Sequence, residues 1–318
     1  MKVFPYSKQD AQSWDEMVAC CPMATFLHTR RFLSYHGDRF HDASLILRKE
    51  DGKIIGLLPA ATDPQDDRRV VSHPGISFGG LLHPGTLFGE RMIEAFEALM
   101  SYYRGQGIIT LRYKAIPYIY HLGPSGDDLY ALFRLGAVRS RCDLSSAIDL
   151  GNRREPSSRR KRGRKKALKS GVEVVDGEPF IEEFWRALEE NLERKIAQRP
   201  VHTTDEIRYL ASLFPNNVKF IVALLNGQVV AGITLFSSRA VTHAQYIASN
   251  ATGYDVSALD AVFEHAIEQT RIEGRRYFDF GTSNRHDGQY LSSSIHQFKT
   301  EFGGGGVAYE FYDLDSAG

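Results

Sequence analysis

The sequence predicts an α/β protein of two domains, each a mixed sheet flanked by helices. The chain has 318 residues, whereas a single hydrophobic core rarely grows beyond about 250–300 residues. Its hydrophobic content of 42% is typical of a globular protein. One order of strands, turn and helix also occurs twice, which indicates a duplicated unit. We place the two domains at residues 1–150 and 151–318.

The first copy of the repeat lies between residues 43 and 112. Asp51-Gly52 is a hairpin turn signal between two apolar runs. Further along, apolar residues recur at three- and four-residue spacing up to Gly105, which predicts a helix that ends there. The predicted elements, in order, are strands over 43–48, 54–61 and 70–82, a helix over 87–103, and a strand over 108–112.

The second copy repeats this order after residue 217. Asn226-Gly227 is its turn, and Gly274 ends its helix. Gly227 follows Gly52 by 175 residues, and Gly274 follows Gly105 by 169, so the spacing within the two copies is nearly the same. The predicted elements are strands over 218–225, 229–236 and 243–248, a helix over 256–273, and a strand over 275–280.

The zero net charge conceals a basic segment. Ten basic residues and one acid lie between Arg153 and Lys169, which leaves 29 basic and 38 acidic residues elsewhere. Ser157 or Ser158 and Gly171 predict the two ends of a helix there. Its side chains would spread over several faces and favour contact with phosphates, for which we select Arg160, Arg164 and Lys165. The alternative is a solvated charged face.

The composition also bears on location and on metal binding. No apolar run reaches the roughly 18 residues of a membrane span, and the first residues do not form a secretory apolar core. These features predict a cytoplasmic protein. Cys20, Cys21 and Cys142 form no Cys-x-x-Cys spacing, so we expect neither a disulfide framework nor a metal site.

The element order within each copy is that of acetyltransferase-like folds. In such folds the third strand diverges from the fourth, and free backbone N–H groups in the gap can stabilise an oxyanion. The following helix offers its N-terminus to phosphates. We therefore expect Gly253 and Ser257, before the helix of the second copy, to contact the acyl donor that such folds bind. A single glycine with Asp255 beside it is a weak signal for coenzyme A, and an ordinary capped helix start remains an alternative.

A glycine-rich segment occupies the corresponding region of the first copy. Residues 72–85 contain four glycines and two prolines. Glycine lets backbone approach a ligand closely, which predicts that His73, Ser77 and Gly79 contact the acceptor. A tight turn or strand bulge is the alternative.

The C-terminal part contains the candidates for acid–base chemistry. Asp279 lies in an apolar strand, where burial raises the pKa of a carboxyl group, so it is our candidate base. A hydrogen-bonded structural carboxylate is the alternative. We expect Tyr246 to relay protons and Lys299 to bind a phosphate or carboxylate, unless Lys299 is a solvated surface residue. Strand alternation would place His243 on the opposite face from Tyr246, and a lone histidine on a strand is more often structural.

Several of these segments together resemble the FemA/FemB/FemX-like (FemAB) family. They are residues 162–174, 199–207, 243–248, 258–261, 277–281 and 298–303. The resemblance implies two tandem GNAT (acyl-CoA N-acyltransferase-like) domains and a transferase acting on an amine. It implies aminoacyl-tRNA or an acyl thioester such as acyl-CoA as donor, with no further cofactor. One branch of the family uses a cell-envelope precursor as acceptor, but the long helical arm of some members is absent from this sequence.

Two other functions remain open at this stage. One is a CoA-dependent N-acyltransferase of the same fold, acting on an amino-sugar, exopolysaccharide or natural-product amine. The other is a non-catalytic RNA-binding protein that uses the basic segment. Walker, HExxH and GxGxxG dinucleotide motifs are not present.

Overall fold

The computed structural model describes residues 1–196 and 200–315, except for the side chains of 194–196. The chain forms two compact units. Unit 1 contains Met1–Asp143, Asn284–Tyr290 and the chain from Ala308 onward, and unit 2 contains Leu144–Ser283 and Leu291–Val307. The chain therefore crosses between units near residue 143 rather than 150, and it returns to unit 1 at its end. Arg199, in one of the motifs above, lies outside the described residues.

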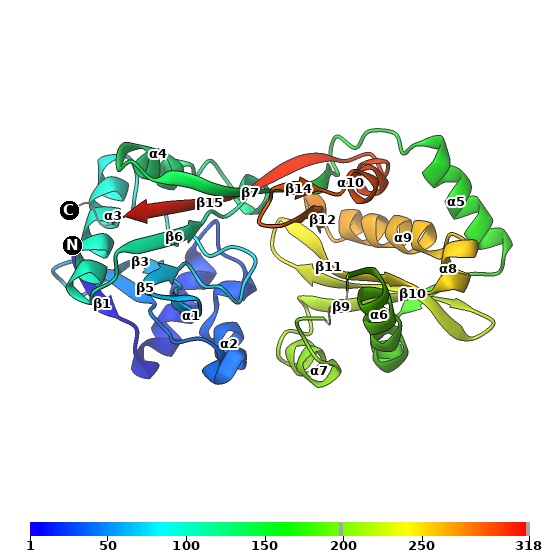
Figure 1. Cartoon of the computed structure of the whole chain (residues 1–318), viewed down its shortest axis with the longest axis horizontal. Coiled ribbons are helices and arrows are strands. Elements are labelled where there is room, and N and C mark those ends of the chain that lie inside the picture. The colour runs from blue at the N-terminus through cyan, green and yellow to red at the C-terminus, as the bar shows by residue number, and fades with distance from the viewer. Residues whose placement is uncertain (197–199, 316–318) are drawn as a thin grey trace. The chain divides into compact units, whose positions relative to one another are not determined.

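Unit 1 contains two sheets (Figure 1). One is antiparallel, in the order β1-β2-β3, and the other contains β4, β5, β6 and β15, with β5 parallel to β6. The strands are β1 (Lys2–Pro5), β2 (Leu45–Arg48), β3 (Ile54–Leu58), β4 (Ala61–Asp63), β5 (Asp66–Val71), β6 (Thr110–Lys114) and β15 (Gly305–Asp315). The helices are α1 (Ala11–Cys20), α2 (Arg30–Leu33), α3 (Glu90–Gly105) and α4 (Asp127–Arg134), with 3₁₀ turns at Lys8–Asp10, Phe26–His28, Ser34–Arg39 and Tyr118–Tyr120.

The core of unit 1 forms around α3. This helix buries Phe96, Leu99 and Tyr103, which recur at the spacing of one helical face. They pack in one apolar cluster with Leu47 of β2 and Leu111 of β6. The helix that was predicted from residue 87 therefore forms, but it begins at Glu90.

Unit 2 is one mixed sheet with helices on both faces. Its strand order is β7-β12-β11-β10-β9-β8. The strands are β7 (Val138–Asp149), β8 (Glu173–Asp176), β9 (Val218–Leu225), β10 (Gln228–Ser237), β11 (Val241–Ser249) and β12 (Tyr277–Thr282), of which β7 begins in unit 1. The helices are α5 (Ser158–Lys169), α6 (Ile181–Ile196), α7 (Thr204–Leu213), α8 (Ala251–Asp255), α9 (Ala258–Ile272) and α10 (Ser293–Thr300). Unit 2 also contains a 3₁₀ turn at Glu178–Phe180. The short pair β13 (Asn284–Arg285), in unit 1, and β14 (Tyr290–Leu291) completes the elements of the chain.

The two faces of the unit 2 sheet carry different helices. Figure 1 shows α9 along one face and α6 along the other. Phe278 and Phe280 of β12 pack on Phe263 of α9. On the opposite face, Tyr246 of β11 packs edge-on against Trp185 of α6, with ring centroids 5.0 Å apart. Residues on β11 and β12 can therefore be assigned to a face by the helix that they contact.

Candidate active site

The parallel strands β11 and β12 pair over three residues only. The last pair is His243 with Asp279, although β11 continues to Ser249 and β12 to Thr282. Beyond this pair, β11 bonds to β10 on its other side. The parallel ladder thus ends in the middle of β11, and backbone groups there can face a ligand. This is the divergence of strands expected from the sequence.

His243 and Asp279 form a hydrogen-bonded pair at that point. His243 Nδ1 lies 2.9 Å from Asp279 Oδ2. The other carboxylate oxygen accepts hydrogen bonds from the Ser145 hydroxyl and from the Gly281 backbone N–H. The Asp279 side chain is fully buried, whereas that of His243 is 15% exposed. A ligand can therefore reach the histidine but not the carboxylate that was predicted to be the base.

Tyr246 lies on the same face as His243, which contradicts the alternation predicted from the sequence. A bulge in β11 explains the difference, because His243 pairs with Phe236 and Tyr246 with Thr234. The extra residue, Gln245, shifts the following side chains to the other face. The Tyr246 hydroxyl is hydrogen-bonded to His202 Nδ1, and its side chain is buried.

Lys299 is buried under the end of β12, not on the surface. Its ammonium donates to the carbonyls of Gly281 and Thr282, each at 2.8 Å. Burial lowers the pKa of Lys299 to about 8, although the Asp279 carboxylate opposes this. The lysine that was predicted to bind a phosphate or carboxylate of a ligand instead holds the backbone beside Asp279.

Of the two predicted donor-binding residues, Gly253 lies within the short helix α8 and Ser257 lies between α8 and α9. The Asn250 side chain caps α8 by accepting a hydrogen bond from Gly253 N–H at 2.9 Å. Gly253 is closely packed, since a Cβ there would lie 2.2 Å from the Val230 carbonyl oxygen. Ser257 precedes α9 in the left-handed region, with φ of 60°. The Gly253 N–H is thus already used, while Ser257 is half-buried at the start of α9.

A cavity of about 420 Å³ lies beside these residues, within unit 2. It is formed by α5, α8, the start of α9 and the end of β11. The α5 residues Arg159, Arg162 and Lys166 line it and are exposed. The remaining lining residues are Arg160, Gly163, Ser249, Gly253, Tyr254, Ser257, Leu259, Asp260 and Phe298. The three cationic side chains of α5 suit a phosphate group.

Arg160 has a different position from its neighbours on α5. It is buried, and its guanidinium lies 3.1 Å from Asp260 of α9 and 3.1 Å from Glu301, the latter without hydrogen-bond alignment. Burial raises the pKa of Asp260 to about 6, although Arg160 lowers it. Arg160 therefore attaches α5 to α9 and is not the free phosphate ligand that was predicted.

Arg164 and Lys165 lie on the exposed surface of α5. They do not line the 420 Å³ cavity. With Arg160 buried, α5 exposes seven basic side chains: Arg159, Lys161, Arg162, Arg164, Lys165, Lys166 and Lys169. The basic segment of the sequence is thus a capped helix with one structural arginine and a cationic surface.

Unit 1 has a related strand pair whose end is closed. The parallel pair β5/β6 ends at Val71 and Arg112. Beyond it, the chain's own segment bonds to both neighbours: Gly79 N–H donates to the Lys114 carbonyl at 3.1 Å, and Leu82 pairs with Leu57 of β3. The glycine-rich segment predicted to meet a ligand therefore occupies the place where these strands diverge.

Lys114 holds the glycine-rich segment, residues 72–85, in this closing position. Its ammonium donates to the carbonyls of His73 and Ile76, and its backbone N–H donates to the Ser72 hydroxyl at 2.7 Å. Burial lowers the pKa of Lys114 to about 7. Burial also lowers the pKa of His73 well below its ordinary value. Among the three residues predicted to contact an acceptor, His73 and Gly79 are buried, and Ser77 is exposed.

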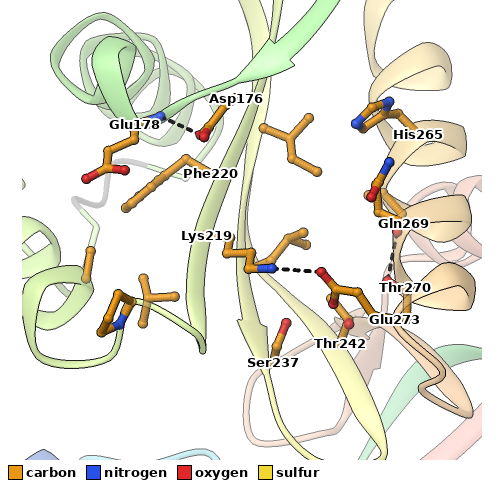
Figure 2. Close-up of a pocket in the computed structure, with 16 residues that line it drawn as sticks. Asp176, Glu178, Lys219, Phe220, Ser237, Thr242, His265, Gln269, Thr270 and Glu273 are labelled. Carbon is orange, nitrogen blue, oxygen red and sulfur yellow. Dashed lines mark hydrogen bonds and ion pairs between the residues drawn. The ribbon is translucent and has the colours of Figure 1, made fainter.

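A second cavity, of about 340 Å³, lies on the α9 face of unit 2 (Figure 2). Figure 2 shows Lys219 of β9 reaching Glu273, beyond α9, and the two charged groups are 2.7 Å apart. Thr242, which lines this cavity, precedes His243 on the strand and so faces the opposite side of the sheet. The cavity is therefore separate from the His243–Asp279 pair.

Within residues 1–196 and 200–315, no group of three or more His, Cys, Asp or Glu side chains is arranged to hold a metal ion. In the same part of the chain, no helix combines the length and apolarity needed to cross a bilayer.

Comparison with known proteins identifies a matching domain family and solved structures of similar fold. Residues 153–290 match the family model described as an acetyltransferase (GNAT) domain. No curated protein matches the sequence. FemX is similar in structure, with a TM-score of 0.69 and 11% identity, covering 99% of this chain and 97% of that chain. L-PGS from Bacillus licheniformis has a TM-score of 0.61 and 11% identity, and the match covers 99% of this chain and 93% of that chain. A tandem GNAT protein from the clavulanic acid biosynthesis pathway has a TM-score of 0.57 and 11% identity, and the match covers 100% of this chain and 99% of that chain.

The domain match and the shared fold define the class of fold. Residues 153–290 are a GNAT-type acetyltransferase domain, and the chain as a whole has the fold of a tandem GNAT protein, as the sequence predicted. Within that class its fold resembles FemX along nearly the whole chain. The resemblance to FemA/FemB/FemX-like proteins is thus confirmed at the level of the fold.

Proposed function

We propose that the chain transfers an acyl or aminoacyl group from an activated donor to an amine, with the donor bound in unit 2. One observation carries the proposal: the β11/β12 ladder ends at His243 and Asp279, while the cationic cavity lies beyond the end of β11. A donor whose phosphates occupy the cavity would extend its acyl carbonyl along β11 toward His243. The acceptor would be a small amine or a cell-envelope precursor.

The reaction is a nucleophilic substitution at the donor carbonyl. The amine nitrogen forms a bond to the carbonyl carbon, and the bond from that carbon to the leaving oxygen or sulfur breaks. One proton leaves the nitrogen, and one reaches the leaving group. Backbone N–H groups of β11 beyond His243 are suited to stabilise the tetrahedral oxyanion, because preorganised donors of this kind are effective in acyl transfer.

The surroundings of the cavity favour aminoacyl-tRNA as donor. The Gly253 N–H is bonded to Asn250, and Asp260 lies in the first turn of α9, so this helix start is a poor pyrophosphate site. By contrast, α5 exposes seven basic side chains, only three of which line the cavity. Such an extended cationic surface suits a polyanion larger than coenzyme A. A cytoplasmic location would accompany a tRNA donor.

An acyl-CoA donor is the second candidate. The match of residues 153–290 to the GNAT acetyltransferase domain favours it. Arg159, Arg162 and Lys166 could hold the phosphates of coenzyme A in the 420 Å³ cavity without the rest of α5. The two donors therefore differ in which basic residues they need.

A binding experiment separates the two donors. Aminoacylated and uncharged bulk tRNA would be titrated at two salt concentrations, with CoA and acetyl-CoA as competitors. One variant replaces Arg159, Arg162 and Lys166 with Gln, and a matched variant on the same helix replaces Arg164, Lys165 and Lys169. A tRNA donor requires salt-sensitive binding that both variants weaken, each lost phosphate contact reducing the log–log salt slope by about 0.7–0.9.

The opposite result assigns the other donor. CoA binding that only the cavity variant loses, without tRNA affinity, would make the chain a thioester-dependent N-acyltransferase. Transfer itself is measured with the donor that binds, offered to a panel of primary amines in single-turnover reactions. If a bound donor yields no amide with any amine of the panel, the proposal of acyl transfer is wrong.

A further inference from the structure

The contacts of Asp279 fix the orientation of His243. Oδ1 accepts from the Ser145 hydroxyl and, at 3.0 Å, from Gly281 N–H. Oδ2 faces His243 Nδ1 at 2.9 Å. With Asp279 ionised, its carboxylate only accepts hydrogen bonds, and the proton between the pair then belongs to Nδ1. His243 is therefore held in the tautomer whose second nitrogen, Nε2, carries a lone pair.

The opposite edge of the ring is available to a ligand. Among the residues that the structure describes, Nε2 of His243 accepts and donates no hydrogen bond. Gly281 lies beside it, and a Cβ at this position would be 3.2 Å from Cε1 and 3.7 Å from Nε2. Because Gly281 has φ of 76°, a side chain there would also strain the backbone. A glycine at position 281 keeps the Nε2 edge uncovered.

We propose that His243 is the general base of the transfer reaction and that Asp279 and Ser145 are positioning residues, an inference that rests on the proposed function. Nε2 takes the proton from the acceptor nitrogen as the C–N bond forms. The resulting imidazolium, stabilised by Asp279, returns that proton to the oxygen or sulfur as its bond to the carbonyl carbon breaks. His243 ends the cycle neutral, and atoms and charges balance.

The location of the pair supports this role. His243 and Asp279 form the last rung of the parallel ladder, so the imidazole stands where β11 loses its partner strand. Lys299 fixes the carbonyls of Gly281 and Thr282 next to the pair. The histidine thus lies where the donor carbonyl is expected, with its support built from three strands, β7, β11 and β12.

The first test does not require activity. Nitrogen-15 NMR of histidine-labelled protein, with the His243 signals assigned by their loss in His243→Gln, reports the tautomer directly. For the neutral imidazole we expect the proton on Nδ1 and none on Nε2, and the reverse arrangement in Asp279→Asn. A proton on Nε2 in the wild type would overturn the proposal.

The second test uses single-turnover transfer with the donor that binds. His243→Ala should slow transfer by about 10²–10⁴-fold while donor binding is retained, and added imidazole should restore part of the rate. Asp279→Asn should slow transfer strongly, and Ser145→Ala by a few fold. His265→Ala, an exposed histidine on α9, is the matched control and should retain the wild-type rate.

The outcomes separate the two levels of the proposal. If the wild type transfers and His243→Ala does so at the same rate, the base assignment is wrong. His243 would have a structural role if His243→Ala loses rate, imidazole does not restore that rate, and the transfer rate of the variant falls at acid pH as that of the wild type does. If the wild type transfers nothing, the proposed function fails, whereas the tautomer measurement still stands.

Discussion

Units 1 and 2 differ most at the ends of their parallel strand pairs. In unit 2 the ladder ends at His243 and Asp279, although both β11 and β12 continue beyond this pair. In unit 1 the residues after Val71 turn back and bond to β6 and β3 through Gly79 and Leu82. One element order therefore gives one open and one closed strand end. The difference lies in the loop after the strand, not in the strands.

The largest expected effect concerns Arg160, which attaches α5 to α9 in unit 2. Arg160→Met would leave Asp260 and Glu301 without their buried cation, which typically costs about 3–5 kcal/mol. We expect this loss in urea unfolding, together with faster hydrogen exchange in α5 and α9. Exchange in α3 and β6 of unit 1 should not change. Equal acceleration in both units would contradict a local role for Arg160.

The next largest effect concerns two tightly packed glycines, one in the segment that closes the strand end of unit 1 and one in unit 2. A Cβ at Gly79 would lie 2.0 Å from the Ser72 carbonyl oxygen, and one at Gly253 would lie 2.2 Å from that of Val230. Gly79→Ala and Gly253→Ala should each destabilise the protein by about 2–3 kcal/mol through overpacking. Only Gly253→Ala should weaken donor binding. If Gly79→Ala weakens it as well, unit 1 takes part in holding the donor.

The burial of Lys114 in unit 1 makes the stability of the protein depend on pH. Burial lowers the pKa of Lys114 to about 7 in the folded protein, from 10.5. Between these values the unfolded chain binds more protons, so stability rises with pH, by up to ~1.4 kcal/mol per pH unit. Urea unfolding at pH 7 and pH 9 should show this gain in the wild type. Lys114→Met should lose most of it, and an unchanged gain would exclude Lys114 as its source.

The smallest expected effect concerns the exposed surface of α5. Arg164→Gln should change the free energy of unfolding by less than about 0.5 kcal/mol, because the side chain is exposed. It should nevertheless weaken tRNA binding and reduce its salt dependence. A large loss of stability would show that Arg164 shares the structural role of Arg160.

The sequence predicted the local elements well because they depend on local patterns. The strand predicted over 218–225 is β9, and Ser157, one of the two predicted helix caps, caps α5. The helix predicted over 256–273 is α9, Ala258–Ile272, preceded by the short helix α8. Turn glycines, caps and helical spacing are all read over a few residues.

The site was predicted less completely because its contacts are distant in sequence. The burial of Asp279 followed from its apolar strand, but its pairing with His243 joins residues 36 apart. A single bulge at Gln245 reversed the predicted faces of His243 and Tyr246. Within the basic run, the glycine at position 163 allows close contact with Asp260 and marks the face of α5 that turns inward. That signal could have identified Arg160 as structural.

The last strand of the chain has a consequence for biosynthesis. The C-terminal part of β15 pairs with β6 of unit 1, and Asp313 accepts two hydrogen bonds from Arg112. While the polypeptide is still being translated, β6 must therefore wait for residues made about 200 positions later. Until those residues have left the ribosome, unit 1 has an unpaired strand edge of the kind that chaperones protect. Premature termination near residue 305 should thus harm the unit that is synthesised first.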